Sequence, residues 1–111
     1  MSGISTHVLD TARGQPAAGI TVMLEIADYY RWREIARGKT DADGRVAALL
    51  PGGVPVAGDY LLKFATDQYF RDQGMTAFYP EVAIRVRLEP GTKYHLPLLL
   101  SPFGYSTYRG S

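Results

Sequence analysis

Two histidines are the residues of this chain best suited to acid–base chemistry. The sequence contains only His7 and His95, and each lies in a segment that we predict to be a strand. His7 has the opposite parity to Val8, and His95 has the opposite parity to Leu96. If the larger apolar set faces the core, both imidazoles point away from it. A pair that shares one polar pocket can move a proton near neutral pH, whereas two separate surface or interface histidines are the alternative.

Arg45 is the candidate binding group for such a pocket. It follows Asp41–Gly44, a turn in which glycine supplies a positive φ, and it begins a short predicted strand over 45–49. If it faces the histidines, its planar guanidinium can hold a carbonyl-rich heterocycle or an oxyanion. An arginine after a turn can equally be a solvated surface charge. The spacing of the residues leaves both interpretations open.

The last segment of the sequence, Ser101–Ser111, is unlike the usual small, polar chain end. It follows the apolar run Leu96–Leu100 and carries three aromatic residues and an arginine: Phe103, Tyr105, Tyr108 and Arg109. We predict that it packs as a last strand over about 106–109. We also expect the chain to end at Ser111 and to place the hydroxyl and carboxylate of that residue in a pocket.

Several other chemistries lack the residues that they need. The chain has no cysteine, which excludes disulfides, thiolate zinc sites and a cysteine nucleophile. Ser111 is not in a Gly-x-Ser-x-Gly elbow, and there is no phosphate loop or dinucleotide fingerprint. A metal site made by both histidines with Asp10 or Glu81 lacks close ligand spacing. We therefore expect no metal and no organic cofactor.

Charge and hydropathy limit the partners. A net charge of +1 gives no electrostatic reason to expect nucleic acid or an anionic membrane as a partner. The aromatic and cationic segment Tyr29–Arg33 is therefore interpreted as a hairpin turn with cross-strand pairs rather than a nucleic-acid platform. No apolar run reaches the roughly 18 residues of a membrane helix, and the start lacks the pattern of a signal peptide. We expect a cytoplasmic protein.

The elements that must position these residues are mostly strands. Apolar and polar residues alternate over 20–27, 60–65 and 82–88, which indicates strands with one buried face. Weaker candidates are 4–10, 32–37, 45–49, 93–101 and 106–109. Only 67–73 resembles a helix, with Thr66 or Asp67 as its cap and Gly74 at its end. Residues 1–111 are therefore predicted to be a single all-β domain, a two-sheet sandwich with one short helix.

Pro97 constrains the strand predicted over 93–101. Proline cannot donate a hydrogen bond to a ladder. This strand is therefore predicted either to lie at the edge of its sheet or to be unpaired at Pro97 on one side.

Several motifs together resemble one known family. They are Ile4–Thr11 with Gly14–Ala17, Thr40–Arg45, Phe78–Glu81, Tyr94–Pro102, and the terminal Tyr108-Arg-Gly-Ser111. In combination they resemble the enzyme branch of the transthyretin-like family, the 5-hydroxyisourate hydrolases. The resemblance spans essentially the whole chain, and the terminal tetrapeptide is its most specific part.

The resemblance implies a fold, an assembly and a reaction. It implies a transthyretin/prealbumin-like sandwich of two four-stranded sheets, assembled as a homotetramer with pockets at a dimer–dimer interface. The implied reaction opens the ring of 5-hydroxyisourate by water, without a cofactor, to give 2-oxo-4-hydroxy-4-carboxy-5-ureidoimidazoline on the way to allantoin. Position by position, it implies catalytic roles for His7, Arg45, His95 and Ser111, and substrate contacts from His7, Arg45 and Tyr108.

The alternative function is that of a transthyretin-like binding protein without catalysis, because a shared fold does not fix function. Both histidines, Arg45 and the terminal tetrapeptide resemble the enzyme branch rather than the carrier. If the histidines work together, we expect one imidazole, that of His95, to be the base for the attacking water.

Overall fold

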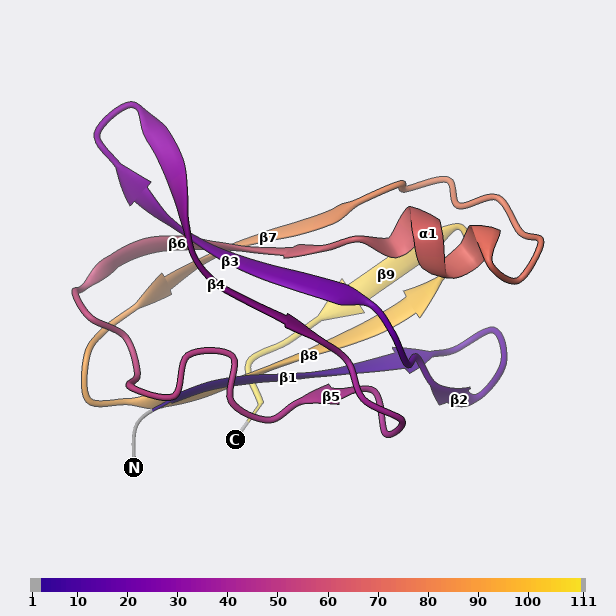
Figure 1. The fold of residues 1–111 in the computed structure, drawn as a ribbon, viewed down its shortest axis with the longest axis horizontal. Coiled ribbons are helices and arrows are strands. Elements are labelled where there is room, and N and C mark those ends of the chain that lie inside the picture. Colours follow the sequence, from indigo (N-terminus) through magenta and orange to yellow (C-terminus); the bar gives the residue numbers. More distant parts are fainter. Residues whose placement is uncertain (1–2, 111) are drawn as a thin grey trace.

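The computed structural model describes residues 3–110. In it, the three segments with the clearest alternation and the weaker candidate 32–37 form one antiparallel sheet (Figure 1). The order of its strands is β4-β3-β6-β7. Their bounds are β3 Thr21–Asp28, β4 Arg31–Lys39, β6 Gly58–Phe64 and β7 Val82–Leu88. The predicted bounds of β7 are confirmed, and those of β3 and β6 shift by one or two residues.

The second sheet is built on a parallel pair of strands from the two ends of the chain. Its order is β2-β1-β8-β9, and β5 also pairs with β1. The bounds are β1 Gly3–Asp10, β2 Gln15–Pro16, β5 Arg45–Val46, β8 Lys93–Ser101 and β9 Gly104–Thr107. The predicted two-sheet sandwich is confirmed. This sheet has five strands rather than four, because the two-residue strands β2 and β5 both pair with β1.

The core lies between the two sheets and is formed by the inward half of each alternating strand. In β1 and β3 the burial alternates residue by residue, as a strand with one buried face requires. The largest fully buried side chains include Tyr60, Phe64, Phe70, Ile4 and Leu98. The hydroxyl of Tyr60 donates to the carbonyl of Val56 at 2.6 Å, so its one polar atom is satisfied.

The single helix, α1 Thr66–Arg71, follows β6 and confirms the helical segment predicted at 67–73. Its predicted side-chain cap is wrong. Ala65 occupies the N-cap position, and no side chain caps the helix. The hydroxyl of Thr66 donates instead to the carbonyl of Tyr79 at 3.0 Å, which ties the helix start to the loop before β7. Gly74, in the turn after the helix, has a φ of 71°.

Pro97 lies in an inner strand, because β8 is placed between β1 and β9. The edge-strand alternative is therefore wrong. The ladder of β8 with β9 begins one residue further on, at Leu98 opposite Thr107. The carbonyl of Pro97 accepts a hydrogen bond from Thr107 Oγ1 at 2.6 Å. The second alternative, a break in pairing on one side at Pro97, is confirmed.

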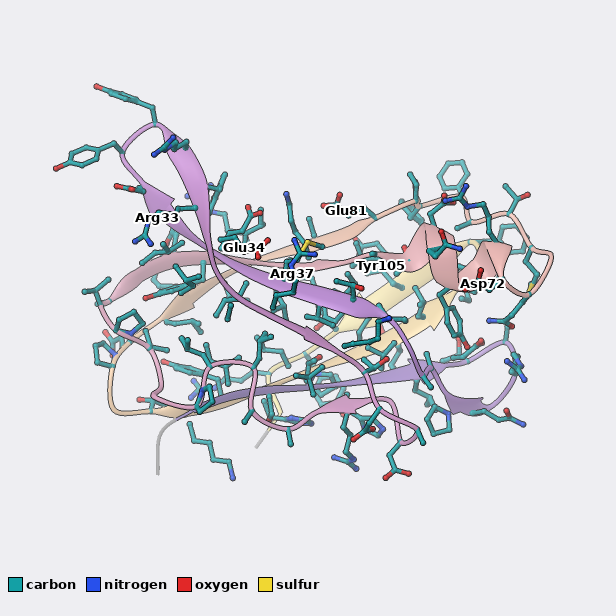
Figure 2. The ribbon with its side chains drawn as sticks, in the orientation of Figure 1. Arg33, Glu34, Arg37, Asp72, Glu81 and Tyr105 are labelled. Atoms are coloured by element: carbon teal, nitrogen blue, oxygen red, sulfur yellow. The ribbon has the colours of Figure 1, made fainter. Side chains whose placement is uncertain are left out.

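The segment Tyr29–Arg33 makes the predicted hairpin between β3 and β4, which projects beyond the body of the sandwich in Figure 1. Tyr29 and Tyr30 form its tip and are fully exposed, at 98% and 103%. Below the tip, charged side chains cover the outer face of the sheet, and Figure 2 shows Glu34 and Arg37 together on β4. This sheet therefore presents a polar, charged outer surface.

Candidate active site

The parallel pairing of β1 with β8 places both histidines on the outer face of their sheet. His7 lies between the buried Thr6 and Val8, and His95 lies between Tyr94 and Leu96, which are also buried. The parity predicted for both imidazoles is confirmed. In the register, Ser5 lies opposite His95 and His7 lies opposite Pro97, so the two histidines are close neighbours on one surface.

A tight turn delivers Arg45 to the same surface. The carboxylate of Asp41 accepts hydrogen bonds from the backbone N–H groups of Asp43 and Arg45, at 2.9 and 3.0 Å. Gly44 has a φ of 76°, and a Cβ there would lie 2.4 Å from the carbonyl oxygen of Val8. Only glycine allows the turn to approach β1 so closely. As a result Arg45 pairs directly with His7 across the short ladder of β5 with β1.

An open cavity of about 370 Å³ lies on this surface. It is lined by Ser5, Thr6, Arg45, Ala47, Lys93 and His95. A smaller cavity of about 170 Å³ adjoins it and shares Ser5, Ala47 and Lys93. The charged side chains of the larger lining are all cationic or imidazole groups. This composition suits a ligand rich in carbonyl oxygens or negative charge.

The imidazole of His95 is held on two sides. Its Nδ1 is hydrogen-bonded to Ser5 Oγ at 2.9 Å. On the other side, the N–H of Gly110 donates to the carbonyl of His95 at 2.8 Å, and a Cβ on Gly110 would lie 2.7 Å from His95 Cδ2. The ring therefore packs against a backbone that only glycine can bring so near. Both contacts restrict the orientation of the ring and leave Nε2 at its far end.

The surroundings of His95 lower its pKa. Partial burial is the largest cause, and the positive charge of Arg45, then that of His7 and Lys93, acts in the same direction. Each disfavours the imidazolium form. His95 is therefore neutral over more of the pH range than an ordinary histidine, as a base that accepts a proton from water requires.

The segment after β9 reaches His95 but does not bring every predicted residue to the cavity. The last strand is predicted at 106–109 and is found two residues earlier, followed by a bridge from Gly110 to His95. Arg109 lies over the ring of Tyr94, 5.0 Å from its centroid. Tyr108 is 58% exposed. Neither Tyr108 nor His7 is among the described residues that line the cavity. Ser111 lies outside the described residues.

Sequence reasoning missed three polar or close contacts of the site. Ser5 and Lys93 line the cavity, and Gly110 packs against His95. The parity of Ser5 matches that of His7, so the pattern of β1 alone places Ser5 on the outer face. Its contact with His95 depends on the parallel register, which no local pattern encodes.

Within the described part of the chain, no group of three or more histidine, cysteine, aspartate or glutamate side chains is arranged to hold a metal ion. Nor is any described helix both long and apolar enough to cross a membrane.

Known proteins resemble this chain over nearly its whole length. It is 48% identical to a 5-hydroxyisourate hydrolase of Mesorhizobium japonicum, over 97% of this chain and 91% of that protein. It is 42% identical to the mouse (Mus musculus) 5-hydroxyisourate hydrolase, over 99% of this chain and 96% of that protein.

Solved structures agree with these sequence relatives. The 5-hydroxyisourate hydrolase of Klebsiella pneumoniae superposes with a TM-score of 0.88 at 37% identity, covering 99% of this chain and 100% of that one. Sea bream transthyretin in complex with thyroxine superposes with a TM-score of 0.87 at 31% identity, covering 96% and 93%. A family model matches residues 4–110, and on this evidence the chain belongs to the HIUase/Transthyretin family.

Proposed function

We propose that this protein is a hydrolase that opens the ring of 5-hydroxyisourate to give 2-oxo-4-hydroxy-4-carboxy-5-ureidoimidazoline, a step of urate degradation to allantoin. The relatives that carry the name of this enzyme match at 42–48% identity over almost the entire chain. The observation that carries the proposal is the cavity in which His95, with its lowered pKa, faces Arg45. A neutral base beside a fixed cation is what hydrolysis of a cyclic amide needs.

In the proposed reaction, a water molecule attacks a ring carbonyl carbon while His95 accepts one of its protons. The carbonyl oxygen becomes an oxyanion, and Arg45 stabilises the charge that develops there. The carbon–nitrogen bond of the ring then breaks, and the proton held by His95 passes to the departing nitrogen. The products of this step are a carboxyl group and a ureido group, which agrees with the name of the product.

The other predicted residues complete this assignment. His7, paired in register with Arg45, is proposed to orient the substrate or share the proton. Tyr108 and Ser111 are proposed to contact the ring in the assembled protein. No metal or organic cofactor takes part in the proposed reaction, and the cytoplasm is its proposed compartment.

We further propose a homotetramer, with the cavity covered by a second subunit. The cavity is open in the single chain, and His7 and Arg45 lie on a face that another subunit could bury. β9 is an edge strand, and exposed aromatic rings gather beside it. Tyr79 contacts Phe78 and Tyr105 edge to face, with centroids 4.9 and 5.3 Å apart. Exposed rings and an unpaired edge are typical of surfaces that contact another chain.

The similarity to sea bream transthyretin supports one competing function, a small-molecule carrier without catalysis. Ultraviolet spectroscopy of urate freshly oxidised by uricase separates the two. We expect the protein to accelerate the decay of 5-hydroxyisourate well above its spontaneous rate, with or without a chelator. Identical decay traces with and without protein would contradict the hydrolase and favour the carrier. Loss of activity on chelation, restored by zinc, would contradict the metal-free reaction.

A further inference from the structure

Among residues 3–110, Ser5 is the one hydroxyl residue whose side chain is hydrogen-bonded to a proposed catalytic group. Its Oγ lies 2.9 Å from Nδ1 of His95, and the two residues are paired in the parallel register of β1 with β8. Ser5 also lines both cavities of the site. Because the backbone register sets this contact, the serine meets the ring in one fixed place.

The hydrogen bond is compatible with two forms of the neutral ring. If Nδ1 carries the proton, it donates to Ser5, and Nε2 keeps a lone pair that can accept a proton from water. If Nε2 carries the proton, Ser5 donates to Nδ1, and the far end of the ring is a donor that cannot act as a base.

The charges around the cavity decide between these forms. The charged groups that act on His95 are Arg45 from β5, Lys93 from β8 and His7 from β1. Arg109, from the segment after β9, lies over the neighbouring Tyr94. Lys and Arg side chains only donate hydrogen bonds, so a lone pair on Nε2 complements this cationic lining and an Nε2–H does not.

We propose that Ser5 is a positioning residue, which accepts a hydrogen bond from Nδ1–H of His95 and thereby keeps the Nε2 lone pair directed into the cavity. Its effect on the rate rests on the proposed hydrolase function, whereas its effect on the tautomer does not. Gly110 supports the same orientation, because its backbone packs against the opposite edge of the ring.

The first experiment is nitrogen-15 NMR of the histidine side chains in the full-length protein, as a function of pH. In the wild type we expect the neutral form of His95 to carry its proton on Nδ1. In Ser5→Ala the two tautomers should mix, and the pKa of His95 should fall further, because the hydrogen bond to Ser5 favours the imidazolium. Ser5→Thr, which retains a hydroxyl, should restore the wild-type spectrum.

The second experiment measures steady-state hydrolysis of 5-hydroxyisourate by the same variants. We expect Ser5→Ala to lower kcat about two- to ten-fold, the usual effect of one hydrogen bond, with little change in KM. Ser5→Thr should recover most of the rate. Ser101→Ala is the matched control, because it removes a hydroxyl from the far end of β8, where Ser101 Oγ bonds to the carbonyl of Gly104.

The outcomes separate the two proposals. A wild-type His95 protonated on Nε2, or an active Ser5→Ala protein with unchanged tautomer and kcat, would overturn the role of Ser5 and leave the hydrolase intact. An inactive wild type with the Nδ1–H tautomer would overturn the hydrolase and leave the hydrogen bond intact. Equal losses in Ser5→Ala and Ser101→Ala would assign the effect to general stability and would also overturn the positioning role.

Discussion

The outer faces of the two sheets differ in whether their positively charged side chains form ion pairs. On the sheet β4-β3-β6-β7, most of the cations form ion pairs with carboxylates, as Arg37 does with Glu34 at 2.8 Å and Arg85 with Asp59. Hydrogen bonds from these arginines lower the pKa of Glu34 and of Asp59. On the face formed by β1, β5, β8 and β9, no ion pair forms among residues 3–110.

Positive charge therefore acts on carboxylates on the first face and on a histidine on the second. On the second face, after the larger effect of burial, Arg45 and Lys93 lower the pKa of a histidine instead of that of a carboxylate. A cation that forms no ion pair can act on a bound ligand or a transition state. We refer to the outer face of β4-β3-β6-β7 as the paired face, because most of its cations form ion pairs and it is a solvated surface. We refer to the face formed by β1, β5, β8 and β9 as the unpaired face, where the cations can act on a bound ligand.

The largest effect should come from removing His95, the proposed general base on the face formed by β1, β5, β8 and β9. We expect His95→Ala to reduce turnover about 10²–10⁴-fold, the usual contribution of a general base, while the sandwich still folds. Ultraviolet kinetics measure the loss, and circular dichroism with light scattering checks the fold and the assembly. Near-normal turnover in the folded variant would refute the role of His95.

Removing the cation beside that base tests the charge effect directly. We expect Arg45→Gln to lower turnover about 10²–10³-fold, because it removes the group proposed to stabilise the oxyanion. It should also raise the pKa of His95, since a positive charge near the imidazolium is lost. The acid limb of the pH–rate profile should then move to higher pH, and the wild type should stay active to lower pH than the variant. If the acid limb does not move, Arg45 does not lower the pKa of His95, and the proposed difference between the two faces is wrong.

Removing a cation that has a smaller effect on His95 should raise the pKa of His95 by a smaller amount. Lys93 is exposed at the cavity and contributes less than Arg45 to the lowered pKa of His95. We expect Lys93→Gln to raise this pKa less than Arg45→Gln does. Lys39→Gln, at the end of β4, should leave it unchanged. NMR titration of His95 in the three variants would contradict this order if Lys39→Gln gave the largest shift.

The smallest effect should come from removing a cation of the paired face, and it should change only the stability of the fold. Lys63 lies 3.3 Å from Glu25 and 3.9 Å from Glu81. We expect Lys63→Met to change the free energy of unfolding by about 1 kcal/mol or less, as for other partly exposed ion pairs. Urea unfolding measures the change, and kcat should be unaltered. A large loss of kcat would show that this face also takes part in catalysis.

Local patterns predicted much of the fold because burial alternates along β1, β3 and much of β6. The bounds of β7 and β8 follow from the sequence, whereas β2 consists of Gln15 and Pro16 only and has no detectable pattern. The side-chain cap predicted for α1 is wrong, because the hydroxyl of Thr66 donates instead to the carbonyl of Tyr79 in the loop before β7. In the site, parity placed the histidines correctly.

The contacts of the site needed the register of strands that are distant in sequence. Ser5 and His95 are separated by 90 positions, so no spacing rule connects them. The approach of Gly110 to His95 likewise depends on how the chain returns after β9. The alternation in a sequence predicts which face of a strand a residue occupies. Which residue lies beside it on the next strand depends on the register of the tertiary fold.

The parallel pairing of β1 with β8 also governs when the site can form. The strands of the sheet β4-β3-β6-β7 lie within 21–88, and all of them leave the ribosome before β8 does. During that time β1 lacks its main partner. Contacts between such distant segments close slowly, because the loop between them must lose its conformational freedom first. A chain interrupted before residue 93 can therefore complete one sheet and still lack the proposed catalytic histidine pair. The exposed edge of β1 makes such a chain prone to aggregation.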